Sequence, residues 1–200
     1  VDVDRSVAFI SSYGVLYARA GSAGFDVLVT ATAKDGSGVS GSYTVHIRPA
    51  VSSISVLFGG EDVTRRTIAF DPTLDGDTVH LSTVITPDTA GQDVVWRVSN
   101  SRIAAVDQTG LVTISEAAAR GSVTVTATAA DGSGKSASTI IRVTRSVTGV
   151  AVSSVNGSDC VAEGKTLRLS AAVSPAAAAN KAVTWSTDAD RTIATVSSSG

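Results

Sequence analysis

The sequence repeats itself at long range, and this repeat constrains the fold more than any other feature. The segment ATAKDGSG at 31–38 returns as ATAADGSG at 127–134, a shift of 96 positions (127 − 31). The hydrophobic residues around it return at the same shift, without a gap: Val27, Val29, Val45 and Ile47 correspond to Val123, Val125, Ile141 and Val143. Because several independent anchors agree, chance similarity is a poor explanation, and the chain is predicted to hold tandem copies of one unit.

A second set of anchors aligns the front halves of the copies at a slightly smaller shift. The pairs are Leu81 with Leu169 (169 − 81 = 88), Pro87 with Pro175 (175 − 87 = 88) and Trp96 with Trp185 (185 − 96 = 89). The drop from 96 to 88 predicts eight extra residues in the middle copy before its second strand, within the segment 59–75. Insertions at the rim of a domain tend to carry function, so this segment is a candidate binding loop.

The repeat divides the chain into one complete unit and two complementary halves. Residues 1–49 correspond to the C-terminal half of a unit, 50–146 to a complete unit, and 147–200 to the N-terminal half of a third. The spacers between units, 48–51 and 144–146, are short and unlike a flexible Gly/Ser coil. We therefore expect units stacked end to end as a stiff rod.

Within each unit the hydrophobic pattern has the period of a β-strand. Residues 78–85 place Val79, Leu81 and Ile85 on one face, and residues 122–129 alternate Val or Ala with Ser or Thr. Helical periodicity nowhere exceeds about two turns. Short strands separated by turn residues predict an all-β fold, with tandem immunoglobulin-like antiparallel β-sandwiches.

Two Asp-Gly pairs mark the predicted hairpin turns. Asp35 with Gly36, and Asp131 with Gly132, each lie between two strand-like runs, where a tight turn needs a positive φ. No helix follows either pair, so we interpret them as hairpin tips and not as phosphate-binding loops.

A tryptophan is expected to fill the space between the two sheets of each sandwich. Trp96 and Trp185 occupy the same position in two copies, on a predicted central strand. The other residues predicted to form the structural core are Leu81, Leu169, Val123, Val125, Ile103 and Ile193.

These segments resemble the group 2 bacterial immunoglobulin-like domain. The front-half pattern of that family is carried by Pro175, VTWSTD at 183–188, IATV at 193–196 and Gly200. The back-half pattern is similar to GSVTVTA at 121–127 followed by DGSG at 131–134. The resemblance covers the whole chain, and the middle copy departs from the pattern in its long segment before the second strand.

The resemblance implies an extracellular protein of bacteria or phages. The protein classes that the resemblance implies are adhesins of the invasin and intimin kind, wall-associated enzymes and virion decorations. The family has no catalytic motif that could be carried over to this chain. We therefore expect a non-enzymatic spacer in a bacterial cell-surface or secreted adhesion protein. A phage virion is the alternative location.

Two further functions stay open at this stage. One is direct binding of a host surface protein, a glycan or a virion surface through the rim loops. The other is a fibre, in which 1–49 of one chain completes 147–200 of an adjacent chain by strand addition. The competing explanation of the two halves is that the sequence is cropped from a longer tandem array. In each case neighbouring Ig-like units, in the same or adjacent chains, are expected partners.

Composition excludes several other classes of function. The formal net charge is −2, from 16 basic and 18 acidic residues, so no basic field is available for nucleic acid or anionic lipid. Disorder is not expected, because 43% of residues are hydrophobic and only 17% are charged. No apolar run approaches the roughly 20 residues of a membrane-spanning helix, so membrane insertion is not expected.

The sequence contains few groups that could carry chemistry. In the alternating pattern of their strands, His46 and His80 occupy positions whose side chains are expected to face outward. The lone Cys160 is expected to be a small buried or half-buried hydrophobe. The weak candidates for calcium ligands are Asp75, Asp77, Glu61 and Asp62. Their spacing matches no calcium loop, and turn formation explains them adequately. We therefore predict no catalytic residue, no cofactor and no metal site.

Overall fold

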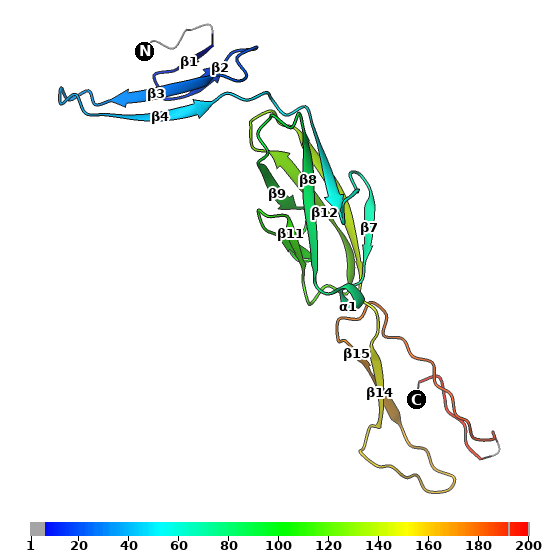
Figure 1. The fold of residues 1–200 in the computed structure, drawn as a ribbon. Helices are drawn as coiled ribbons and strands as arrows, with labels where there is room; N and C mark the ends of the chain where they lie inside the picture. Colours follow the sequence, from blue (N-terminus) through cyan, green and yellow to red (C-terminus); the bar gives the residue numbers. More distant parts are fainter. Residues whose placement is uncertain (1–6, 192, 200) are drawn as a thin grey trace. The chain divides into compact units, whose positions relative to one another are not determined.

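The computed structural model describes residues 7–191 and 193–199 (Figure 1). Residues 1–6, Thr192 and Gly200 lie outside the described part, Gly200 being one residue of the family motif. The chain contacts group into two compact units, the first made of Val1–Val56, Thr83–Val95 and Ala127–Ala137. The second is made of Leu57–Ser82, Trp96–Thr126 and Ser138–Gly200.

The segment before residue 50 forms two antiparallel pairs of strands. Strand β1 (Ala8–Ile10) pairs with β2 (Leu16–Ala18), and the longer β3 (Asp26–Thr32) pairs with β4 (Ser40–His46). Ala8, Val27 and Ile47 form a small buried cluster. Most other side chains of these strands are exposed, because each pair is a separate two-stranded sheet.

Two larger sheets form the middle of the chain. The first has the strand order β10-β11-β8-β5-β6, and the second has the order β7-β13-β12-β9. The bounds in the first sheet are β5 Ser53–Phe58, β6 Glu61–Asp62, β8 Thr78–Thr86, β10 Ala104–Val106 and β11 Leu111–Ile114. Those in the second are β7 Thr67–Phe70, β9 Val94–Val98, β12 Arg120–Ala129 and β13 Ser136–Thr144. The fold is an all-β, Ig-like sandwich, as the sequence predicted.

The inserted segment 59–75 differs from the rim loop that the sequence suggested. Its first strand, β6, pairs with β5, and its second strand, β7, pairs in parallel with β13. It ends in the four-residue helix α1 (Pro72–Asp75). The insertion is thus part of both sheets, and its parallel pairing is an exception to the predicted antiparallel pattern.

The segment after residue 146 contains one strand pair among its described residues. Strand β14 (Gly149–Ser154) pairs with β15 (Leu169–Ser174) in an antiparallel register. The described residues beyond β15, including the VTWSTD segment at 183–188, form no strand. Most side chains of the pair are therefore exposed or half-buried.

The Asp-Gly turns have the same geometry in both copies. Gly36 and Gly132 have positive φ values of 83° and 81°. Asp35 and Asp131 each accept a hydrogen bond through Oδ1 from the backbone N–H two residues later, at 3.0 and 2.9 Å. A side chain that bonds its own backbone in this way favours a turn, so the local sequence is sufficient to set this geometry.

The predicted core residues divide according to the copy in which they lie. In the complete copy Leu81, Val123 and Val125 are fully buried, Trp96 is 4% exposed, and Ile103 is half-buried. In the third copy Leu169 and Trp185 are only half-buried. Ile193 is 80% exposed, contrary to the expectation, because the described residues around it form no strand that would face a second sheet. Cys160 is also exposed, in the stretch between β14 and β15, where we expected a buried or half-buried side chain.

Gly110 shows how closely the interior of the complete copy is packed. Its φ is +85°, and its N–H and C=O groups face the turn and strand β8. A Cβ atom at this position would collide with the Leu81 carbonyl and lie 3.2 Å from Cε2 of Trp96. Glycine is required here by both backbone angle and space.

Candidate functional site

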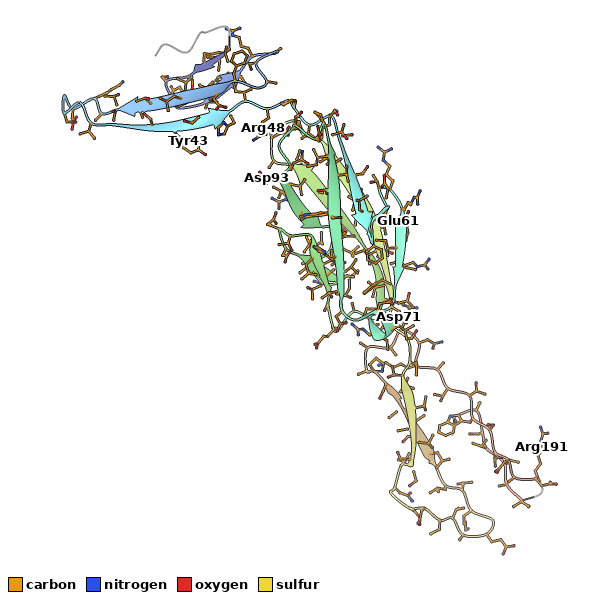
Figure 2. The ribbon with its side chains drawn as sticks, in the orientation of Figure 1. Tyr43, Arg48, Glu61, Asp71, Asp93 and Arg191 are labelled. Carbon is orange, nitrogen blue, oxygen red and sulfur yellow. The ribbon has the colours of Figure 1, made fainter. Side chains whose placement is uncertain are left out.

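A group of hydrogen-bonded side chains lies where β13 ends and the chain leaves the complete copy. We call this site the junction and define it by Asp71, Thr73, Asp77, Arg145 and Ser146 (Figure 2 labels Asp71). Asp71 and Thr73 come from the start of α1, and Asp77 comes from the turn before β8. Arg145 and Ser146 follow β13 directly.

Arg145 is the central residue of the junction. Its side chain is only 9% exposed, and its Nη2 donates to Oδ1 of Asp77 at 2.8 Å. Its Nε donates to the Ala118 carbonyl at 3.3 Å, and Nη2 makes a longer contact of 3.4 Å to the Ser115 carbonyl. A guanidinium can be removed from water only when such partners replace the lost hydration, so these contacts fix its position.

The backbone of Arg145 is held on both sides. Its N–H donates to the Ala119 carbonyl at 2.9 Å, and its carbonyl accepts from the N–H of Ala179 at 2.8 Å. Ala178, next to that donor, is 4% exposed. The residue that begins the spacer is therefore hydrogen-bonded through its main chain as well as its side chain.

Asp71 joins the insertion to the next residue of the spacer. Its Oδ1 caps α1 by accepting from the Thr73 N–H at 2.9 Å, and the same atom accepts from the Ser146 N–H at 3.2 Å. Thr73 Oγ1 in turn donates to the Ser146 carbonyl at 3.3 Å. Partial burial pushes the pKa of Asp71 upward, but the hydrogen bonds from Ser146 and Thr73 outweigh it and hold the pKa below its usual value.

The spacer before the complete copy is held by a different carboxylate. Val51 is 2% exposed, and its N–H donates to Oδ2 of Asp131 at 2.7 Å. Hydrogen bonds from Ser133 and from the Val51 N–H lower the pKa of Asp131, against a smaller opposing effect of burial. Asp131 thus closes its own hairpin turn with one oxygen and anchors the end of the spacer with the other.

Three of the four calcium candidates are used in an ion pair or a hydrogen bond with other protein groups. Asp77 pairs with Arg145, Asp75 accepts from the Asp71 N–H at 3.1 Å, and Asp62 accepts from the Thr64 N–H at 2.8 Å. Glu61 lies exposed on β6, apart from the α1 residues (Figure 2). Among residues 7–191 and 193–199, no three His, Cys, Asp or Glu side chains lie close enough together to hold a metal ion.

The two histidines lie on exposed strand faces, as their parity suggested. His46 contacts Asp26 across the β3–β4 pair, with both side chains more than half exposed. Nε2 of His80 lies 3.2 Å from the Thr109 carbonyl. Asp26 and His46 both line an open surface pocket, together with Arg48 and Thr89. Because both side chains of the pair are more than half exposed, the geometry gives no reason to assign either histidine a chemical role.

Sequence reasoning did not find the junction. Arg145 and Asp77 are 68 positions apart, so no local pattern links them. The start of α1 does carry a local signal, because an Asp followed by Pro, as in Asp71-Pro72, is typical of a helix N-cap and first turn. That signal would have placed a helix inside the insertion.

Comparison with known families decides what kind of domain this is. The model of the bacterial Ig-like domain (group 2) matches residues 66–140 and again residues 146–200. The chain belongs to the group 2 bacterial Ig-like domain family. The two separate matches of this Ig-like family agree with the tandem repeat.

The relatives of this Ig-like chain are much longer proteins. An uncharacterized protein of Clostridium acetobutylicum is 37% identical over 131 residues, which is 65% of this chain and 13% of that protein. The lacto-N-biosidase of Bifidobacterium bifidum is 45% identical over 69 residues, which is 34% of this chain and 6% of that enzyme. Among solved structures, PcdhgB3 EC1-4 has a TM-score of 0.32 and 14% identity, covering 75% of this chain and 42% of the other.

Family membership indicates the kind of protein in which such a domain occurs. The group 2 Ig-like family is a family of non-catalytic domains, and its members typically occur in extracellular and surface proteins. In the described residues there is no helix with the length and hydrophobicity needed to cross a membrane.

Proposed function

We propose that this chain is a structural spacer within a bacterial cell-surface or secreted adhesion protein. In this role each Ig-like unit adds length, and the spacers between units limit bending. The observation that carries the proposal is the junction, where the first two residues after β13 are held by side chains of the complete copy. A phage virion is the second candidate location.

The contacts of the spacer support limited bending. A Gly/Ser linker would make few contacts of its own and would behave as a flexible coil. Here Arg145 is nearly buried and Ser146 is bonded to both Asp71 and Thr73. Bending at these residues would break several hydrogen bonds, including one to a charged group, so it carries a free-energy cost that a coil lacks.

The insertion 59–75 favours the spacer over direct binding of a ligand by this segment. It supplies β7 to one sheet and Asp71 to the junction. Its turn at 63–66 is also hydrogen-bonded to the sandwich, because the Arg65 N–H donates to the Ser138 carbonyl at 2.7 Å. Host proteins or glycans stay possible partners of the parent protein, and the match to lacto-N-biosidase fits an accessory position beside a catalytic domain.

Nitrogen-15 relaxation of the backbone tests the spacer directly. The full chain is measured at a dilution where it is monomeric, and the correlation times of β14–β15 are compared with those of β12–β13. We expect equal values in the wild type and a shorter value for β14–β15 in Arg145→Ala. The control is Arg142→Ala, because Arg142 is an exposed arginine on β13, three residues before Arg145. Independent motion of β14–β15 in the wild type would contradict the proposal.

A further inference from the structure

We propose that one outer sheet face of the complete copy binds an acidic polysaccharide. The face belongs to the β7-β13-β12-β9 sheet, and we call it the arginine face and define it by Arg97, Arg120 and Arg142. The proposal goes beyond the spacer function, because it concerns an exposed face of the sandwich and not the residues between units. Either proposal can therefore fail without the other.

The strand period directs the three arginines away from the interior. On β12 and β13 the alternate residues are buried, as Val123 and Ile141 are, because successive side chains of a strand point to opposite faces. Arg120 and Arg142 occupy the other set of positions on these strands and are exposed. Arg97 is exposed on β9. The three arginines thus share the solvent-facing side of one sheet.

The outward positions of the four strands carry no acidic residue. Apart from Arg120, Arg142 and Ile140, every outward residue of β12 and β13 is Ser or Thr, and those of β7 are Thr67 and Ala69. The ion pairs found in the described part of the chain involve none of the three arginines. The face is therefore locally positive and rich in hydroxyl groups, although the formal net charge of the chain is −2.

The acidic residues that flank these strands lie beyond the strand ends. Asp71 follows β7, and Asp93 precedes β9 (Figure 2). Oδ1 of Asp71 already accepts hydrogen bonds from the N–H groups of Thr73 and Ser146. This carboxylate is thus engaged in the junction and leaves the positive charge of the arginine face in place.

Hydrogen bonds fix how far apart two of the arginines are. The Arg145 N–H donates to the Ala119 carbonyl, so three residues further along Arg142 (145 − 3) lies opposite Ser122 (119 + 3). Arg120 is then the diagonal neighbour of Arg142, with Cα atoms about 7–8 Å apart. Two guanidinium groups at this separation repel each other, and a bound anion would relieve that repulsion.

The third arginine requires an extended ligand. The Ser99 N–H donates to the Thr124 carbonyl at 2.9 Å, so Arg97 (99 − 2) lies opposite Thr126 (124 + 2). That position is roughly 13 Å along the sheet from Ser122. A small anion can contact two of the arginines, whereas a polymer with repeated negative charges can contact all three.

The other side chains of the face favour a polysaccharide among polymeric anions. The large apolar side chains at outward positions, Val95 and Ile140, are only 38% and 37% exposed, which is too little for the apolar core of a protein interface. The outward positions also lack aromatic rings on which bases could stack. Ser and Thr hydroxyls donate and accept as sugar hydroxyls do, and guanidinium groups pair with carboxylates and similar oxyanions.

The internal repeat shows that the fold does not require these arginines. Their equivalents in the other copies are His46, Gly24 and Ser186 (142 − 96, 120 − 96 and 97 + 89). The strand pair β3–β4 forms with the first two of these changes in or beside it. The arginines are thus a property of the complete copy and not of the repeat, and their removal should leave the fold intact.

Titration calorimetry with a heparin fragment of uniform length tests the proposal, because heparin carries both carboxylate and sulfate groups. The blocking variant is Arg97→Gln/Arg120→Gln/Arg142→Gln. We expect the wild type to bind and the blocking variant to bind at least roughly tenfold more weakly. Wild-type affinity should fall as salt rises from about 50 to 200 mM, and uncharged dextran should not bind.

A charge-matched control separates this face from the overall charge of the chain. The control is Arg48→Gln/Arg168→Gln/Arg191→Gln, which removes three exposed arginines from other segments. Both triple variants have a formal net charge of −5 (−2 − 3). We expect the control to bind heparin nearly as the wild type does, and circular dichroism should show both variants folded.

Nuclear magnetic resonance of the wild type locates the binding without any substitution. On addition of the heparin fragment, we expect the amide signals of Ser122, Thr124 and Ile140 to shift. Those of Thr78 and Ser82, exposed on β8 in the other sheet, should stay in place.

Any of four results would overturn the proposal. The first is no binding of heparin by the wild type at low salt, and the second is equal affinity of the two triple variants. The third is a set of shifted amides that lies away from the arginine face. The fourth is a DNA duplex of similar length that binds as tightly as heparin, because the face would then accept polyanions without selecting a polysaccharide.

Discussion

Arg145 and Asp77 form an ion pair of 2.8 Å in which the two partners differ in exposure. The side chain of Arg145 is 9% exposed and that of Asp77 is 44% exposed. The pair therefore connects a nearly buried cation, whose Nε and Nη2 also donate to main-chain carbonyls, to a carboxylate that water still reaches. Breaking the pair costs more free energy at Arg145 than at Asp77, because the nearly buried guanidinium cannot recover its hydration.

Removing the carboxylate should destabilise the protein measurably. We expect Asp77→Ala to lower the free energy of unfolding by about 1–2 kcal/mol, less than for a fully buried pair because solvent screens Asp77. Arg145→Met keeps much of the side-chain volume without the charge, and should cost less than Asp77→Ala. Urea unfolding followed by tryptophan fluorescence measures both, with Arg142→Ala expected within about 0.5 kcal/mol of wild type. Equal stability of Asp77→Ala and wild type would show that the pair contributes nothing.

Gly110 and Gly132 should respond very differently to the same substitution. Both have φ values above +80°, but a Cβ meets Leu81 and Trp96 only at Gly110. Gly132→Ala should cost about 1–2 kcal/mol from the backbone alone. Gly110→Ala should cost more than about 3 kcal/mol, because the collision adds to the strain. Chemical denaturation of the two variants decides this, and similar losses would mean that the interior around Trp96 is looser than described.

The lowered pKa values of Asp71 and Asp131 predict a loss of stability in acid. A carboxylate whose pKa is lower in the folded state stabilises the protein above its unfolded pKa, near 3.9, and this contribution is lost as the pH falls through the folded pKa. We expect stability to fall below about pH 4. The Asp71→Asn/Asp131→Asn variant should be less stable at pH 7 and lose less between pH 5 and pH 3. A pH dependence equal to that of wild type would contradict these assignments.

A core substitution should distinguish the complete copy from the half-copy. Val125 is fully buried, whereas its equivalent Val29 is half-buried. Val125→Ala should lower the free energy of unfolding by roughly 1–3 kcal/mol, from lost contacts and the cavity left behind. Val29→Ala should have a smaller effect in the dilute, monomeric chain. Thermal unfolding compares the two variants, and the reverse order of stability would be inconsistent with the burial pattern.

Local sequence patterns predicted much of the complete copy. The alternation that buries Val79, Leu81 and Ile85 is set by the strand period, and the turn at Asp131-Gly132 needs only the conformational preferences of those two residues. Trp96 is buried because its copy contains both sheets. In these cases the information lies within a few residues or within one repeat.

Other features depend on partners that the local sequence does not show. Ile193 has the same motif position as Ile103, but it is exposed because the strands that would cover it are missing from the described part of its copy. The insertion 59–75 has the composition of a loop, yet its strand β7 pairs with the edge of β13. The bond between Arg145 and Asp77 exists only after the sheets have formed.

The completeness of 50–146 as an Ig-like unit underlies the proposed spacer function. The most direct measurement is equilibrium unfolding of this segment alone, in which Trp96 is the single tryptophan. We predict one cooperative transition that coincides by tryptophan fluorescence and by far-ultraviolet circular dichroism. An unfolded segment, or transitions that separate between the two probes, would contradict a complete sandwich in these residues.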